Sequence, residues 1–158
     1  ESEGFDLLTM GKPEGPGCYC YVNNVLRGVT ARLIKDYSLV VIDNEAGLEH
    51  LSRKTTAQAD VLLVVSDGTA AGLRAAKRIA ELVVELKIKA RRRCLLLNRL
   101  DRDMPEEKLS GLGLEYAGRI PEDKHIMEVN VRNEPVFNVP DSSPALKALE
   151  AIVETLTH

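Results

Sequence analysis

Two cysteines, Cys18 and Cys20, lie one residue apart in the stretch GPGCYCYVNN at residues 15–24. Thiolates bind zinc or nickel well, but a structural site of this kind needs four ligands and the pair supplies two. A disulfide within the pair would close a tight, strained loop, so we do not expect one. The third cysteine, Cys94, lies in an apolar run and is expected to be buried. The pair is therefore either half of a four-thiolate site completed by a second subunit on a two-fold axis, or two unrelated structural cysteines.

A second group of polar residues follows the ends of apolar runs. Asp43 ends the run YSLVVID, Asn98 ends RCLLLN, and residues 121–123 (Pro-Glu-Asp) follow LEYAGRI. In an open parallel sheet, ligands bind at the carboxyl ends of the strands. There, an aspartate can hold magnesium through water opposite a nucleotide phosphate, an asparagine amide can pair with a base edge, and the Pro-Glu-Asp stretch can wall an adenine. Each also has an ordinary structural alternative, as a helix cap, a turn residue or a helix start.

Those apolar runs alternate with stretches of helical periodicity, which predicts an α/β fold. Runs that are apolar on both faces indicate a parallel sheet covered by helices. Helices are expected from near Cys18 to Ile34, from Thr69 to about Ile88, and after Ser143. The predicted strands are FDLLTM from Phe5, YSLVVID from Tyr37, VLLVVSD from Val61, RCLLLN from Arg93 and LEYAGRI from Leu114.

Length and composition limit the classes of protein that need to be considered. The chain has 158 residues, 44% of them hydrophobic and 28% charged, which is typical of one soluble domain over residues 1–158. A net charge of −3 argues against a protein that coats nucleic acid. No apolar run approaches the roughly 20 residues of a membrane span, so we expect no membrane partner. Three cysteines, an odd number, fit a reducing compartment, so we expect the cytoplasm.

The motifs GPGCYCYVNN and VVIDNEAGLEHLSRKTT, with the order of the strand ends, resemble the deviant-Walker ATPases that include the nitrogenase iron protein, MinD and ParA. The resemblance is greatest to the CooC-type ATPases that mature carbon monoxide dehydrogenase. It implies a P-loop NTPase-like fold of the deviant Walker A class that binds ATP or ADP with magnesium. The implied site residues are Asp43 as the catalytic Walker B and switch residue, Asn98, Arg99, Pro121, Glu122 and Asp123 around the adenine, and Cys18 and Cys20 as metal ligands.

One part of that family's machinery is missing from these residues. Nothing fits the G-x-x-x-x-G-K-[ST] phosphate cradle or its lysine-bearing variant, because Gly11 and Lys12 are followed by Pro13. The sequence therefore predicts the C-terminal portion of such a domain, incomplete at the N-terminus and unable by itself to hydrolyse ATP. In the family's sheet the P-loop strand lies between the strands that contain Asp43 and Val61. Two strand edges should then be unpaired, which favours self-association or lower stability.

The resemblance implies an ATP-dependent metallochaperone that helps insert nickel into carbon monoxide dehydrogenase. It would act as a homodimer joined by a shared zinc or nickel site, with the dehydrogenase apoenzyme as its partner. ATP would close the dimer, and hydrolysis would reopen it and change the grip on the metal.

Three alternatives stay open. An iron–sulfur electron-transfer ATPase like the nitrogenase iron protein would need the cysteine pair for its cluster, because Ala46 stands where that protein has a cluster cysteine. A spatial regulator like MinD or ParA is expected to end in a basic amphipathic helix, whereas SSPALKALEAIVETLTH has one lysine and two glutamates. The third alternative is a non-enzymatic interaction module.

Overall fold

The computed structural model describes residues 4–9, 28, 35–44 and 58–157. The chain divides into two units, Glu1–Thr56 and Ala57–His158, and each is described by itself. The division does not test the predicted single domain over residues 1–158.

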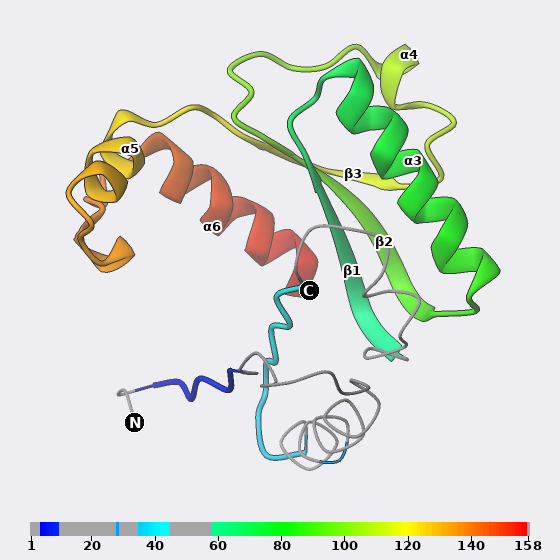
Figure 1. The fold of residues 1–158 in the computed structure, drawn as a ribbon, viewed down its shortest axis with the longest axis horizontal. Coiled ribbons are helices and arrows are strands. Elements are labelled where there is room, and N and C mark those ends of the chain that lie inside the picture. The colour runs from blue at the N-terminus through cyan, green and yellow to red at the C-terminus, as the bar shows by residue number, and fades with distance from the viewer. Residues whose placement is uncertain (1–3, 10–27, 29–34, 45–57, 158) are drawn as a thin grey trace, which may run out of the picture. The chain divides into compact units, whose positions relative to one another are not determined.

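The second unit is built on a parallel sheet of three strands in the order β1-β2-β3 (Figure 1). They are β1 (Gln58–Ser66), β2 (Lys89–Asn98) and β3 (Glu115–Ile120). The central strand β2 is buried on both faces, since Cys94 and the three leucines that follow it are at most 3% exposed. Burial on both faces is what a parallel sheet requires, and the predicted α/β fold is confirmed.

Helices α3 (Ala70–Glu85) and α6 (Pro144–Thr157) lie on opposite faces of this sheet (Figure 1). Leu95 and Leu97 of β2 belong to the same buried cluster as Leu73 and Ala76 of α3. Because side chains alternate along a strand, Cys94 and the leucine between that pair face the α6 side. The shorter elements are α4 (Glu106–Leu109), α5 (Lys124–Val131) and the 3-10 turn η1 (Val136–Asn138).

Gly118 lets α6 approach β3 closely. Its φ of +139° lies where L side chains rarely go, and a Cβ there would lie 2.9 Å from the Ile152 side chain of α6. The pairing of β2 with β3 also shifts register at this level, between Leu95 and Leu96. A larger residue at 118 would therefore push α6 away from the sheet.

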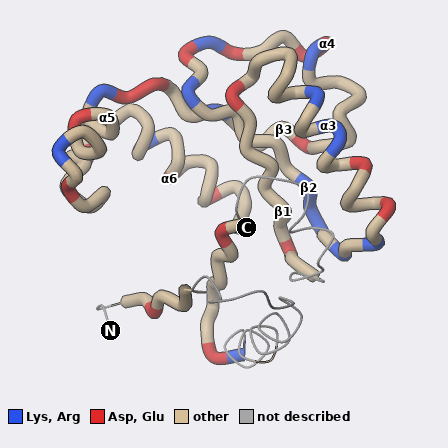
Figure 2. Tube along the Cα trace, viewed as in Figure 1, with Lys and Arg blue, Asp and Glu red and all other residues tan. Residues whose placement is uncertain are grey.

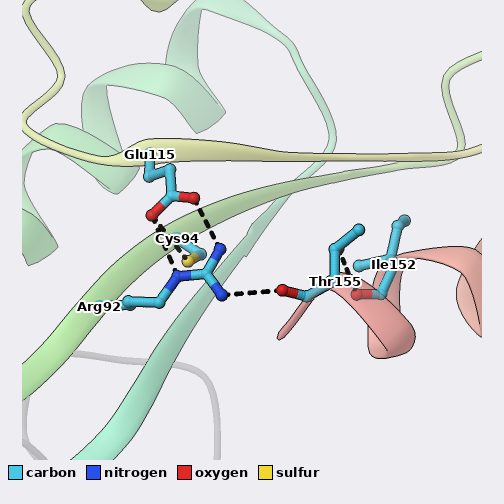
Figure 3. A network of polar contacts seen from close by, with 5 residues as sticks. All are labelled: Arg92, Cys94, Glu115, Ile152 and Thr155. Atoms are coloured by element: carbon cyan, nitrogen blue, oxygen red, sulfur yellow. Dashed lines mark hydrogen bonds and ion pairs between the residues drawn. The ribbon is translucent and has the colours of Figure 1, made fainter. Parts of the chain in front are cut away.

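We call the carboxyl ends of the strands, where the chain leaves the sheet, the strand exits. A polar network joins the elements at the opposite end of the sheet (Figure 3). Arg92 donates from Nε and Nη2 to the two carboxylate oxygens of Glu115, at 3.2 and 2.6 Å, and from Nη1 to the Thr155 carbonyl oxygen, at 2.8 Å. It thus joins β2, β3 and the last turn of α6. The Arg92 hydrogen bond lowers the pKa of Glu115, and burial is the main cause of the raised pKa of the nearby Cys94 thiol. Figure 2 shows the basic residues that run along the start of β2.

Two predicted strands, from Phe5 and from Tyr37, differ from the expectation in their described parts. Phe5 forms a single bridge, and residues 37–44 contain one bend, at Ser38, and no strand. The Tyr37 hydroxyl donates to the Asp6 carboxylate, but Leu7 and Val41 are 79% and 83% exposed. An apolar run makes a strand only when a neighbour completes the hydrogen-bond ladder, and a lone pair of strands is marginal in water. Most of the predicted first helix lies outside the described residues.

Within residues 58–157, β1 pairs on one side only, with β2. An unpaired edge beside the Val61 strand was expected from the sequence. Self-association through that edge stays a prediction.

Candidate functional site

A pocket of about 1020 Å³ opens at the carboxyl ends of β2 and β3. All five residues predicted to surround an adenine line it, namely Asn98, Arg99, Pro121, Glu122 and Asp123. Its other walls come from α5, η1 and the start of α6, and they are mostly apolar. The sheet therefore brings two separate strand exits together as predicted, because the carboxyl ends of parallel strands meet at one edge.

The β2 exit presents an amide with unused hydrogen-bonding capacity. Asn98 is half-buried, and its side chain makes no hydrogen bond to any other residue that the structure describes. The next residue, Arg99, has a φ of +56°, a left-handed conformation that is uncommon outside glycine. The Leu100 N–H then donates to the Ile120 carbonyl at 3.0 Å, which fixes this turn beside the end of β3. The geometry leaves the Asn98 amide free to pair with a ligand.

Asp123 uses its carboxylate to join the starts of two helices. One oxygen accepts from the His125 N–H at 2.8 Å and caps α5. The other accepts from the Ser143 hydroxyl at 2.6 Å and from the Ala145 N–H at 3.1 Å, at the start of α6. The Ser143 hydrogen bond is the main cause that lowers the pKa of Asp123 to about 2. Asp123 thus shapes the pocket by holding α5 and α6 together.

Replacing Ser143 with alanine should lower the free energy of unfolding by about 2 kcal/mol. The change removes the cap on the Leu146 N–H and a hydrogen bond to a charged group. Ser143 is fully buried, whereas the neighbouring Ser142 is exposed, so Ser142→Ala should change stability little. Urea unfolding of both variants measures the difference. Equal losses would contradict this account of Ser143.

The same contact predicts a dependence on pH. The pKa of Asp123 is about 2 in the folded chain against an ordinary 3.8, so its ionised form stabilises the fold above about pH 4. That stabilisation is lost as the pH falls from about 4 to about 2. In Ser143→Ala the loss over this range should be smaller, because the main cause of the low pKa is gone.

The β1 exit is a tight, self-bonded turn. Thr69 caps α3 by accepting from the Gly72 N–H at 3.0 Å, and Asp67 accepts from the Thr69 N–H and hydroxyl at 3.0 and 2.8 Å. The backbone bond to Thr69 is the main cause of the lowered pKa of Asp67, with a small contribution from the Arg99 charge. Gly72 lets these side chains approach the backbone, because a Cβ there would lie 2.4 Å from an Asp67 oxygen and 2.6 Å from the Ser66 hydroxyl oxygen, and one of them would have to move.

The remaining predicted site residues, Asp43, Cys18 and Cys20, belong to the first unit, which is described by itself. Asp43 is exposed there. Cys18 and Cys20 lie outside the described residues. In the described ranges, no three His, Cys, Asp or Glu side chains gather closely enough to hold a metal ion.

Some residues that hold the pocket wall in place from outside were not predicted from the sequence. Asp101 accepts from the Glu122 N–H at 3.1 Å, and Arg119 donates to Asp103 at 2.7 Å and to the Leu100 carbonyl at 3.1 Å. The partners are 16 to 21 residues apart, on different strand exits. No local pattern reports such pairs, so the sequence held no usable signal for them.

Comparison with known proteins identifies relatives over the whole chain, although no protein-family model matches it. The chain is 43% identical over 161 residues to an uncharacterized ATP-binding protein of Methanocaldococcus jannaschii, covering 100% of this chain and 64% of that relative. It is 30% identical over 115 residues to the septum site-determining protein MinD of Helicobacter pylori, covering 65% of this chain and 43% of MinD. Its homologues are ATP-binding proteins of the MinD/ParA superfamily. The chain spans less than two thirds of the length of each of these relatives.

The fold agrees with this result. The structure of the MinD cell division protein of Aquifex aeolicus superposes with a TM-score of 0.71 at 21% identity, covering 85% of this chain and 60% of that one. Another relative is the carbon monoxide dehydrogenase accessory protein CooC of Rhodospirillum rubrum, 34% identical over 100 residues. That alignment covers 61% of this chain and 37% of CooC. The predicted fold class is confirmed.

Proposed function

We propose that the pocket at the β2 and β3 exits binds the adenine base of ATP. The observation that carries this proposal is the convergence of Asn98, Arg99 and residues 121–123 on one pocket, with the Asn98 amide unpaired. The ATP-binding relative that covers the whole chain supports it.

The residues present suit an adenine. Adenine presents a donor and an acceptor side by side, and a side-chain amide can pair with both at once. A pocket of about 1020 Å³ is at the upper end of the usual range for small-molecule sites, about 300–1,000 Å³, so it has room for the base and ribose. For Asp43, in the first unit, we propose the Walker B role, in which an aspartate holds magnesium through water.

A titration with nucleotides tests the proposal. These 158 residues contain no P-loop motif, so the base should supply most of the affinity. We expect AMP and ATP to bind weakly and within about threefold of each other, GTP about tenfold more weakly, and no hydrolysis above background. Equal affinity for ATP and GTP would contradict base recognition. Micromolar binding of Mg-ATP with turnover would show that the chain has a phosphate site of its own.

The cysteine pair supports a more specific role. The protein acts as an ATP-dependent metallochaperone that assists nickel insertion into carbon monoxide dehydrogenase, with Cys18 and Cys20 of two subunits forming a four-thiolate zinc or nickel site. The CooC relative, an accessory protein of that dehydrogenase, supports this role. The partners would be a second copy of the chain and the dehydrogenase apoenzyme.

A MinD-like spatial regulator is the second candidate, favoured by the MinD relative and the MinD fold. Helix α6 uses Ala145 and Ile152 to pack into the fold. Among the helices that the structure describes, none is long and apolar enough to cross a lipid bilayer. Metal analysis separates the candidates, because a spatial regulator has no need of thiolate-bound metal, and iron with sulfide would indicate the electron-transfer alternative.

A further inference from the structure

The segment between β2 and α4 packs down onto the protein core. Leu100 and Met104 are partly buried against the cluster under α3. A Cβ at Gly68, in the turn after β1, would lie 3.2 to 3.6 Å from these two side chains, so the segment also contacts the β1 exit. Apolar anchoring on this scale holds a loop in one position. Residues 99–104 therefore form a fixed support for the residues that they contact on the side away from this cluster.

On that side, residues 99–104 contact residues 120–122, which form one wall of the pocket. Ile120 accepts from the Leu100 N–H at 3.0 Å, and the Glu122 N–H donates to the Asp101 carboxylate at 3.1 Å. Arg119 binds the same segment: its Nε donates to the Asp103 carboxylate and its Nη1 donates to the Leu100 carbonyl oxygen. Pro121 has no N–H to offer. Among the residues that the structure describes, Asp101 is thus the only one whose side chain accepts a hydrogen bond from a backbone N–H of residues 120–122.

Asp101 itself is exposed and does not line the pocket. We propose that Asp101 is a positioning residue of the base site: through the Glu122 N–H it fixes the Pro121–Glu122 wall at a set distance from Asn98 and Arg99. The proposal rests on the proposed nucleotide-binding function. A planar base needs its two walls held at a fixed separation, and a displacement of 1 Å is enough to cost affinity.

Two substitutions separate positioning from a direct electrostatic role. Asp101→Asn keeps an oxygen that can accept from Glu122, whereas Asp101→Ala removes it. In Asp101→Ala we expect amide hydrogen exchange at Glu122 to become about tenfold faster and AMP affinity to fall about five- to tenfold. In Asp101→Asn both should stay within about twofold of the unaltered chain. Glu107→Gln, an exposed change on α4 outside the pocket, is the matched control.

Exchange and affinity are read by NMR on the same samples. The proposal is overturned if Asp101→Asn behaves like Asp101→Ala, since the charge would then matter more than the acceptor. Faster exchange with unchanged affinity would also overturn it, because the wall would then not affect the base. Failure of the unaltered chain to bind any adenine nucleotide would instead contradict the proposed function, and the same titration would reveal it.

Discussion

Replacing Asn98 with alanine should weaken AMP and ATP binding by about fivefold or more. The amide would make the polar contacts that recognise the base, and losing such a pair costs about 1–3 kcal/mol, which is roughly a 5- to 150-fold change. The thermal unfolding midpoint should barely move, because the Asn98 side chain makes no hydrogen bond to the rest of the described chain. Equilibrium titration and a thermal melt of the same preparation measure both quantities. Unchanged affinity would remove Asn98 from the site.

Replacing either Cys18 or Cys20 with serine should remove most of the bound metal and weaken the dimer. If two subunits share a four-thiolate site, the metal joins them, and binding free energy becomes assembly free energy. We expect one zinc or nickel ion per two chains in the unaltered protein, measured by elemental analysis and native mass.

The control for this prediction comes from the structure. Cys94 is fully buried in β2, so Cys94→Ala, which avoids burying a new hydroxyl, should leave the metal stoichiometry unchanged. One metal per single chain, or full metal content after either serine substitution, would return Cys18 and Cys20 to an ordinary structural role.

The elements that the sequence predicted well are those whose signal is local. The helix expected from Thr69 to Ile88 forms as Ala70–Glu85, and Thr69 is its cap. The strand expected from Val61 begins earlier, at Gln58, because pairing with Lys89 of β2 extends it. Apolar periodicity and cap residues are encoded within a few positions, so these predictions needed no tertiary information.

The rest depends on contacts between distant residues. Helix α5 begins where Asp123 caps it, and the same carboxylate binds Ser143, 20 residues away. The brace from Asp101 to Glu122 is equally non-local. The apolar run from Tyr37 shows the converse, since its β-branched and apolar residues indicate a strand but no described neighbour completes a ladder for it.

Mapping bound AMP by nitrogen-15 NMR tests most directly whether an adenine base binds between the carboxyl ends of β2 and β3. We expect the largest saturable shifts on the Asn98 side-chain amide and on the backbone amides of Arg99 and Glu122. Resonances at the opposite end of the sheet, around Arg92, should not move. Shifts confined to the Arg92 end, or no saturable shift at millimolar AMP, would contradict adenine binding in the pocket at the carboxyl ends of β2 and β3.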